Sequence, residues 1–241
     1  MMKTLCVAVV VLSLTSVCQP ASLACEKLLK PVDKGPDLSG GWYLIAISSD
    51  VCLVTTLLNS VFWPSFAVDV TSKDTPNIYD VNFKVKMYGY CTNETEQYFY
   101  EKNNIFSVSS NNTPSGEPDV LLQSGCPDCI VVKDTDIIDT LMLYSRRKTV
   151  TAAELKEFET QTECLGWPTP QVLNTDHEYE NCPALDDDDD DTDTSRLSLM
   201  MYQRLKNVYT EPLKCLAYDF LYYPRLAYEW VRQEWDNIWP F

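Results

Sequence analysis

Few residues of this chain have the type and spacing needed for chemistry. Cys126 and Cys129 have the Cys-x-x-Cys spacing of a redox dithiol, but they lie between two predicted strands and no βαβ pattern surrounds them. The sole histidine of the sequence, His177, has no serine or cysteine motif beside it that a general base could activate. Both features are more typical of structural roles. We therefore predict no catalytic residue, no metal site and no cofactor.

A run of aspartates, Asp186–Asp191, has the ligand type that calcium prefers. A calcium-binding loop spaces its ligands and contains a glycine, and this run has neither. We interpret residues 186–195 as a solvated acidic linker. The net charge of the whole chain is −16, which disfavours nucleic acid and anionic membrane surfaces as partners.

The first 24 residues have the organisation of a secretory signal. Lys3 precedes an apolar stretch from Leu5 to Leu14, and small residues follow, so cleavage after Ala21 or after Ala24 fits equally well. The stretch is well short of the ~20 residues that span a bilayer, and we expect no later transmembrane segment. We therefore predict a secreted, extracellular protein.

In the oxidising secretory compartment, the remaining cysteines and two sequons predict covalent modifications. Eight cysteines follow the signal, and an even number in a secreted chain indicates disulfides rather than metal sites. Asn93 and Asn111 each begin an Asn-x-Thr sequon, which predicts glycosylation on two surface loops.

Residues 41–146 are predicted to be almost wholly β. Eight short runs rich in aromatic and β-branched residues are separated by turn formers, and these runs are residues 42–48, 61–72, 78–90, 96–102, 105–109, 119–123, 129–133 and 140–146. The third run alternates most clearly, with one apolar face formed by Tyr79, Val81, Phe83, Val85 and Met87. One face of this strand should therefore meet an apolar interior and the other should meet water.

A helix is expected after the last strand. Thr151 and Glu154 form a capping box, in which each side chain accepts a hydrogen bond from a free amide at the helix start. The helix should stop near Gly166, and residues 171–174 should return as a short strand.

Eight up-and-down strands and one helix predict an all-β, closed antiparallel barrel. The competing fold is a β-sandwich, whose usual Cys…Trp…Cys spacing is not convincing here.

The interior of such a barrel is either a filled core or a cavity. If the apolar face of the third strand points inward, the second strand adds Phe62, Phe66, Val68 and Val70, and Tyr98 and Tyr100 supply hydroxyls at the mouth. A mostly apolar site with a few polar groups is the usual design of a small-molecule pocket.

At this point the chain resembles the lipocalins over roughly residues 25–185. Gly40 and Trp42 are similar to the first family motif, and residues 141–146 are similar to the last strand, whose arginine in this family packs across the tryptophan. By that resemblance Gly40, Trp42 and Arg146 close the barrel floor. The middle motif is only loosely matched, by Thr135, Asp136 and Tyr144.

The segment 149–165, followed by residues 172–177 and Cys182-Pro183, narrows the resemblance to the alpha-1-acid glycoprotein group. The fish saxitoxin and tetrodotoxin-binding proteins look closest, and apolipoprotein M looks more distant. The resemblance implies disulfides Cys25–Cys164 and Cys91–Cys182. It leaves the other cysteines open, so that Cys126 could pair with Cys129, or one of them with Cys52, and Cys215 is unassigned.

The resemblance implies a carrier of a small hydrophobic or amphipathic ligand, such as a guanidinium toxin, a steroid, a lipid or a drug. The lipocalin that acts as a prostaglandin synthase uses a cysteine on an early strand, whereas here Cys52 precedes residues 61–72, so we expect no enzyme.

The tail, residues 196–241, departs from the family. It carries an amphipathic stripe that Pro212 should end, formed by Leu197, Met200, Met201, Leu205 and Val208. The alternative function is therefore an interaction protein that recruits a protein partner or a lipoprotein surface through its acidic and aromatic tail.

Overall fold

The computed structural model describes residues 23–111, 113–135, 138–180, 182–184, 191–208 and 210–216. Nearly all of the expected signal segment and the end of the tail lie outside these residues, so both remain predictions. Within the described residues, no helix is long and apolar enough to cross a membrane.

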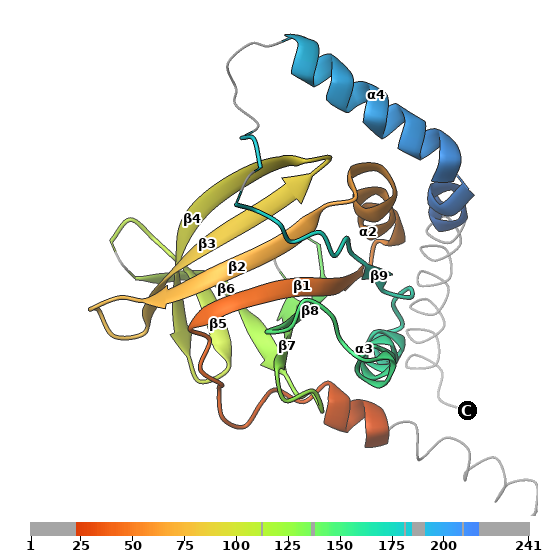
Figure 1. Ribbon diagram of the computed structural model, residues 1–241. Coiled ribbons are helices and arrows are strands. Elements are labelled where there is room, and N and C mark those ends of the chain that lie inside the picture. The colour runs from red at the N-terminus through yellow and green to blue at the C-terminus, as the bar shows by residue number, and fades with distance from the viewer. Residues whose placement is uncertain are drawn as a thin grey trace, which may run out of the picture.

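A closed antiparallel barrel forms the body of the molecule (Figure 1). Its strands are β1 (Gly40–Ser49), β2 (Ser65–Ser72), β3 (Ile78–Met87), β4 (Tyr90–Glu101), β5 (Asn104–Val108), β6 (Pro114–Leu122), β7 (Cys129–Asp134) and β8 (Thr140–Ser145). Each strand pairs with the next, and β1 pairs with both β2 and β8, which closes the sheet. The short β9 (Gln171–Val172) adds to β1. The predicted fold class is confirmed, and the β-sandwich alternative is wrong.

Several of the expected strands have different bounds, and the one expected at 119–123 begins at Pro114. The strand expected at 61–72 begins only at Ser65, because the preceding apolar residues form a helical connection. The strand expected at 78–90 ends at Met87, because Tyr88 and Gly89 both have positive φ and form a tight turn into β4. As a result β4 begins at Tyr90, six residues earlier than expected, and Asn93 lies on a strand rather than on a loop.

The helices that accompany the barrel include α2 (Cys52–Leu57), the π-helix η1 (Leu58–Phe62), α3 (Ala152–Cys164) and α4 (Asp191–Val208), and residues 23–28 and 210–216 are also helical. The expected capping box starts α3, since the Thr151 hydroxyl accepts from the Glu154 amide at 3.3 Å and the Glu154 carboxylate accepts from the Thr151 amide at 2.7 Å. Phe158 of α3 is buried against outward side chains of the barrel, including Ile45 and Leu143. The helix therefore covers the outside of the sheet (Figure 1).

The described part of the tail is helical. The end of the expected 186–195 linker belongs to α4, which begins at Asp191, and the preceding part of that linker lies outside the described residues. Pro212 lies within the helical residues 210–216, so it does not end the helical part of the tail as expected.

Four disulfides tie these elements together. Cys25–Cys164 joins the helical residues 23–28 to the end of α3, and Cys91–Cys182 joins β4 to the chain that leaves the barrel. These are the two pairs that the resemblance implies. The open assignments resolve as Cys126–Cys129, within the β6–β7 connection, and Cys52–Cys215, between α2 and residues 210–216.

Candidate functional site

The interior of the barrel contains a cavity of about 250 Å³. Its lining is mostly apolar and aromatic, and consists of Leu38, Trp42, Val68, Val70, Tyr79, Val81, Phe83, Tyr98, Tyr100, Ile105, Asp119, Ile130, Val132, Asp134, Met142 and Tyr144. A mostly apolar cavity of this size suits a small ligand.

One end of the cavity is closed by Trp42 and Arg146. The Trp42 indole donates to the Leu38 carbonyl at 2.8 Å, and the Arg146 guanidinium carbon lies 3.7 Å from the centroid of the Trp42 ring. The same guanidinium donates to the carbonyls of Gly41, at 3.1 Å, and Asp37, at 3.2 Å. Partial burial lowers the pKa of Arg146, and the nearby Asp37 opposes that shift. The guanidinium therefore joins the entering chain to the end of β8.

Gly40 makes room for this arrangement. Its φ of +94° is one that side chains rarely adopt, and a Cβ there would lie 2.9 Å from Nη1 of Arg146. The Gly-x-Trp pattern thus has a local steric reason: the glycine lets the arginine approach the tryptophan.

Tyrosine and phenylalanine rings form one wall of the cavity. The Tyr79 and Tyr100 rings meet edge to face at 6.1 Å, as do the Phe83 and Tyr98 rings. The Tyr100 hydroxyl donates to the Pro36 carbonyl at 3.0 Å, and burial raises the pKa of Tyr100 to about 12. The Tyr100 phenol therefore remains protonated at neutral pH and presents a neutral hydroxyl and an aromatic face.

The charged groups that line the cavity, among the described residues, are two carboxylates, Asp119 and Asp134. Tyr98 donates to a carboxylate oxygen of Glu96 at 2.6 Å. Burial is the main cause of the raised pKa values of Tyr98 and Tyr144, and the fields of nearby carboxylates raise both values further. The cavity therefore combines an apolar surface with two carboxylates.

Six of the ten residues predicted to bind ligand line this cavity, and these are Val68, Tyr79, Val81, Phe83, Tyr98 and Tyr100. The other four do not. Phe62 is on η1 rather than on a strand and is 38% exposed, and Phe66 packs with Leu44 and Ile47 next to the cavity. Val85 pairs with Phe66, and Met87 pairs with Tyr90 at the end of β3, so both lie beyond the cavity along the strand.

Sequence reasoning missed the far wall of the cavity. That wall comes from β6, β7 and β8 and includes Asp119, Ile130, Val132, Asp134, Met142 and Tyr144. The period-2 spacing of these residues within β7 and β8 was a usable signal. The inward face of these strands depends on how the sheet closes.

At the end of the barrel opposite Trp42 lie α2, η1 and Trp63, which we call the lid, residues 52–63. The lid connects the end of β1 to the start of β2, whereas Trp42 lies near the start of β1. Leu58 of the lid packs on a cluster of Leu44, Ile47 and Leu173, and that cluster also contacts the cavity residues Met142 and Tyr144. Figure 1 shows α2 at this end of the barrel.

The remaining predicted residues lie away from the cavity. Asn93 on β4 and Asn111 on the turn after β5 are both exposed. His177 is buried against the outside of the barrel, where its ring lies 4.6 Å from that of Tyr43 and its Nδ1 lies 3.2 Å from the Tyr179 hydroxyl. These contacts match the expected structural role of the histidine.

Comparison with known proteins gives one family and several related folds. The ApoM domain model matches residues 7–186. No curated protein matches the sequence. Among solved structures, the siderocalin Ex-FABP is 14% identical, with a TM-score of 0.47, covering 57% of this chain and 94% of its own. Lipocalin 12 from rat epididymis is 10% identical, with a TM-score of 0.48 and coverages of 61% and 89%, and siderocalin Q83 is 15% identical, with a TM-score of 0.46 and coverages of 57% and 88%. The narrower resemblance to alpha-1-acid glycoprotein stays a prediction.

Proposed function

Because this chain belongs to the ApoM domain family of lipocalins, we propose that it is a secreted carrier of a small amphipathic molecule that bears a positive charge. The observation that carries the proposal is the cavity lining, which joins aromatic rings to the carboxylates of Asp119 and Asp134. The apolar leader and the four disulfides support the secreted location.

Apolar contact supplies the affinity in this proposal. Moving an apolar ligand surface from water into the cavity lowers the free energy by about 25 cal/mol for each Å² buried, before the costs of association. The cavity walls include valine and isoleucine side chains, whose contacts with a ligand are not directional. The apolar lining therefore favours a hydrophobic ligand body without selecting its identity.

The carboxylates supply the selectivity. Asp119 and Asp134 lie where water is partly excluded, so their attraction for a cation is stronger than it would be on the surface. The faces of Tyr79, Tyr100 and Phe83 add a cation–π attraction of about 0.5–2 kcal/mol. Amines and guanidinium compounds, including the toxins bound by the fish proteins that the sequence resembles, fit this chemistry better than fatty acids.

A pair of matched ligands tests the proposal. N-dansylethylenediamine carries an amine, and its N-acetyl derivative is neutral with the same fluorophore. We expect the amine to bind more tightly than the acetyl derivative. The variant D119N/D134N should lower the affinity for the amine by about tenfold or more, and should change the affinity for the acetyl derivative by less than about threefold. The control is D69N/D80N, because Asp69 and Asp80 pair with Lys84 and Lys73 on the outside of the barrel.

Two results would contradict this function. Tighter binding of the neutral derivative would exclude selection for a cation, and equal effects of D119N/D134N and D69N/D80N would exclude the interior carboxylates. Native mass spectrometry of protein purified from its own body fluid then identifies the cargo, for which we expect about one small molecule per chain.

A second function is favoured by exposed apolar side chains on α4. Leu199 is 55% exposed and Tyr202 is 65% exposed, on a helix that departs from the lipocalin pattern. An interaction protein could recruit a protein partner or a lipoprotein surface through this face. The variant L199S/Y202S should then lose that partner and keep its affinity for N-dansylethylenediamine, whereas a pure carrier would be unaffected in both respects.

A further inference from the structure

We propose that residues 191–208 and 210–216 act as a clamp that holds the lid closed over the cavity and thereby sets the rate of ligand exchange. This proposal rests on the carrier function above and adds the control of access to the same site. The term clamp refers to α4 and the helical residues 210–216. In Figure 1 the clamp runs alongside the lid, at the end of the barrel where β1 passes into α2.

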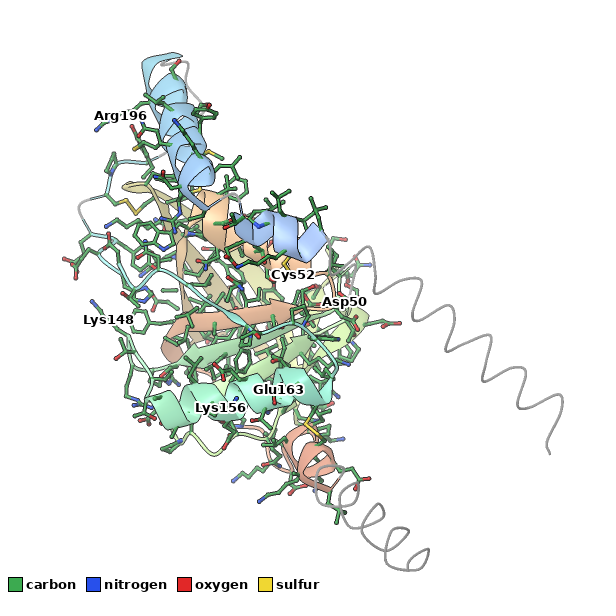
Figure 2. The ribbon with its side chains drawn as sticks, turned by 90° about the vertical axis from the view of Figure 1, so that its right-hand side faces the viewer. Asp50, Cys52, Lys148, Lys156, Glu163 and Arg196 are labelled. Carbon is green, nitrogen blue, oxygen red and sulfur yellow. A yellow bond between two sulfur atoms is a disulfide. The ribbon has the colours of Figure 1, made fainter. Side chains whose placement is uncertain are left out.

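A covalent bond attaches the clamp to the lid. Cys52, at the first turn of α2, is bonded to Cys215, which is 163 residues later in the chain. Both cysteines are buried, and the Thr56 hydroxyl lies 2.9 Å from the sulfur of Cys215. Figure 2 shows Cys52 directly beside residues 210–216. The first half of the lid therefore cannot swing away from the barrel unless the clamp moves with it.

Arg204 attaches the second half of the lid. Its guanidinium carbon lies 4.1 Å from the centroid of the Trp63 ring, and its Nη2 donates to the Asn59 carbonyl at 3.3 Å. Trp63 has a φ of +47°, in the left-handed region that a bulky residue rarely adopts. A contact that holds the Trp63 ring therefore helps to hold the reversal of the chain at the end of the lid. We assign Arg204 as a positioning residue.

Two features of the lid make its closed conformation less stable. Within the described part of the chain, the buried Oδ1 of Asn59 and Oγ of Ser60 have no hydrogen-bond partner, and opening would give both atoms access to water. Residues 58–62 form a π-helix, a conformation that is rare and is frequently found at functional sites.

The hold of the barrel on the lid combines the packing of Leu58 with side-chain hydrogen bonds. It includes long hydrogen bonds from the Asn174 amide to the Trp63 carbonyl, at 3.4 Å, and from the Asn59 amide to Gln171, at 3.2 Å. Tyr88 also donates to the Val61 carbonyl. We infer that the clamp decides how often the lid opens.

Stopped-flow fluorescence of the full chain with N-dansylethylenediamine tests the clamp. A lid that closes over both the empty and the loaded cavity slows entry and exit alike, so loosening it should raise the association and dissociation rate constants together. We expect increases of about tenfold or more in C52S/C215S, which frees a long loop. In R204Q, which loses a cation–π contact, we expect both rate constants to increase by about threefold to tenfold. The equilibrium constant should stay within about threefold in both.

Matched controls remove the same groups elsewhere. C126S/C129S deletes a disulfide in the β6–β7 connection, at the opposite end of the barrel. R196Q deletes an exposed arginine two turns earlier on α4, and Figure 2 shows Arg196 far from Cys52. Both controls should keep the rate constants of the unaltered protein.

Amide hydrogen exchange without ligand gives a second, independent test. C52S/C215S and R204Q should exchange the amides of residues 53–62 faster than the unaltered protein, with the protection of β1 and β8 unchanged. If neither variant changes the amide exchange of residues 53–62, the clamp proposal is wrong, whatever the ligand-binding rates show. If dissociation alone accelerates and association does not, the residues only support the shape of the site. If no form binds either dansyl compound, the carrier function fails, and the exchange data still decide whether the clamp holds the lid.

Discussion

The Arg146 guanidinium lies over the indole of Trp42, 3.7 Å from the ring centroid, and links two segments that are about a hundred residues apart. Its donors also bind the carbonyls of Asp37 and Gly41, so one side chain connects the chain entering β1 with the chain leaving β8. Closure of the barrel floor thus depends on contacts that only the folded sheet can make.

Replacing Arg146 with glutamine should lower the free energy of unfolding by about 1–3 kcal/mol, because a cation–π contact and two hydrogen bonds to carbonyls are lost. Urea unfolding followed by tryptophan fluorescence measures the change. Lys148→Gln is the control, because it removes an exposed ion pair with Glu178 and should cost less than about 1 kcal/mol. Equal costs for the two variants would exclude a special role for Arg146.

Gly40→Ala should destabilise the fold more than Gly89→Ala. Both glycines have φ near +90°, so an alanine at either position has a similar backbone cost of about 1 kcal/mol. Only at Gly40 would the new methyl group meet Arg146, whereas nothing lies within 4 Å of a Cβ at Gly89. The difference between the two unfolding free energies isolates that contact, and a difference of zero would disprove it.

Gln161 should be among the most costly polar residues to remove. It is fully buried, and its amide donates to the carbonyls of Leu28, at 2.9 Å, and Gln123, at 2.8 Å. Gln161→Leu leaves two carbonyls unpaired and should cost about 2–4 kcal/mol. Thr160→Ala, one residue earlier on α3, should cost less than about 1 kcal/mol. Thermal unfolding of both variants provides the comparison.

His177 should make stability fall as the pH falls below about 6.5, the usual pKa of histidine. Burial lowers the pKa of His177 in the folded protein, and Lys148 lowers it further. The unfolded chain therefore binds a proton first, so the histidine costs nothing above its unfolded pKa and destabilises the fold below it. Unfolding free energies of the unaltered protein and of His177→Gln should diverge between pH 7 and pH 5.5. Parallel curves would contradict this account.

Both sequons should carry glycans when the protein passes through a eukaryotic secretory pathway. Asn93 and Asn111 are exposed, although Asn93 is on a strand. Asn93→Gln and Asn111→Gln should each lower the mass of the secreted protein by one glycan, measured by intact mass spectrometry. A variant with unchanged mass identifies an unused sequon.

The amino-acid sequence by itself determined the local elements of this protein. Alternation along residues 79–87 predicts β3, and the Thr151–Glu154 pair predicts the start of α3, because hydrogen bonding and side-chain direction repeat over two to four residues. Local pattern failed at residues 61 and 62, which were expected to begin a strand but belong to η1. A run without alternation does not distinguish the two.

Tertiary structure alone decided which of these residues meet. Val85 and Phe83 share one face of β3, yet only Phe83 lines the cavity, because the depth of a residue in the barrel depends on the pairing of all the strands. Asp119 and Asp134 face inward through the closure of the sheet, and Cys52 finds Cys215 through the docking of α4 on the lid. Such contacts join residues far apart in the chain, so their partners depend on the global packing rather than on any local period.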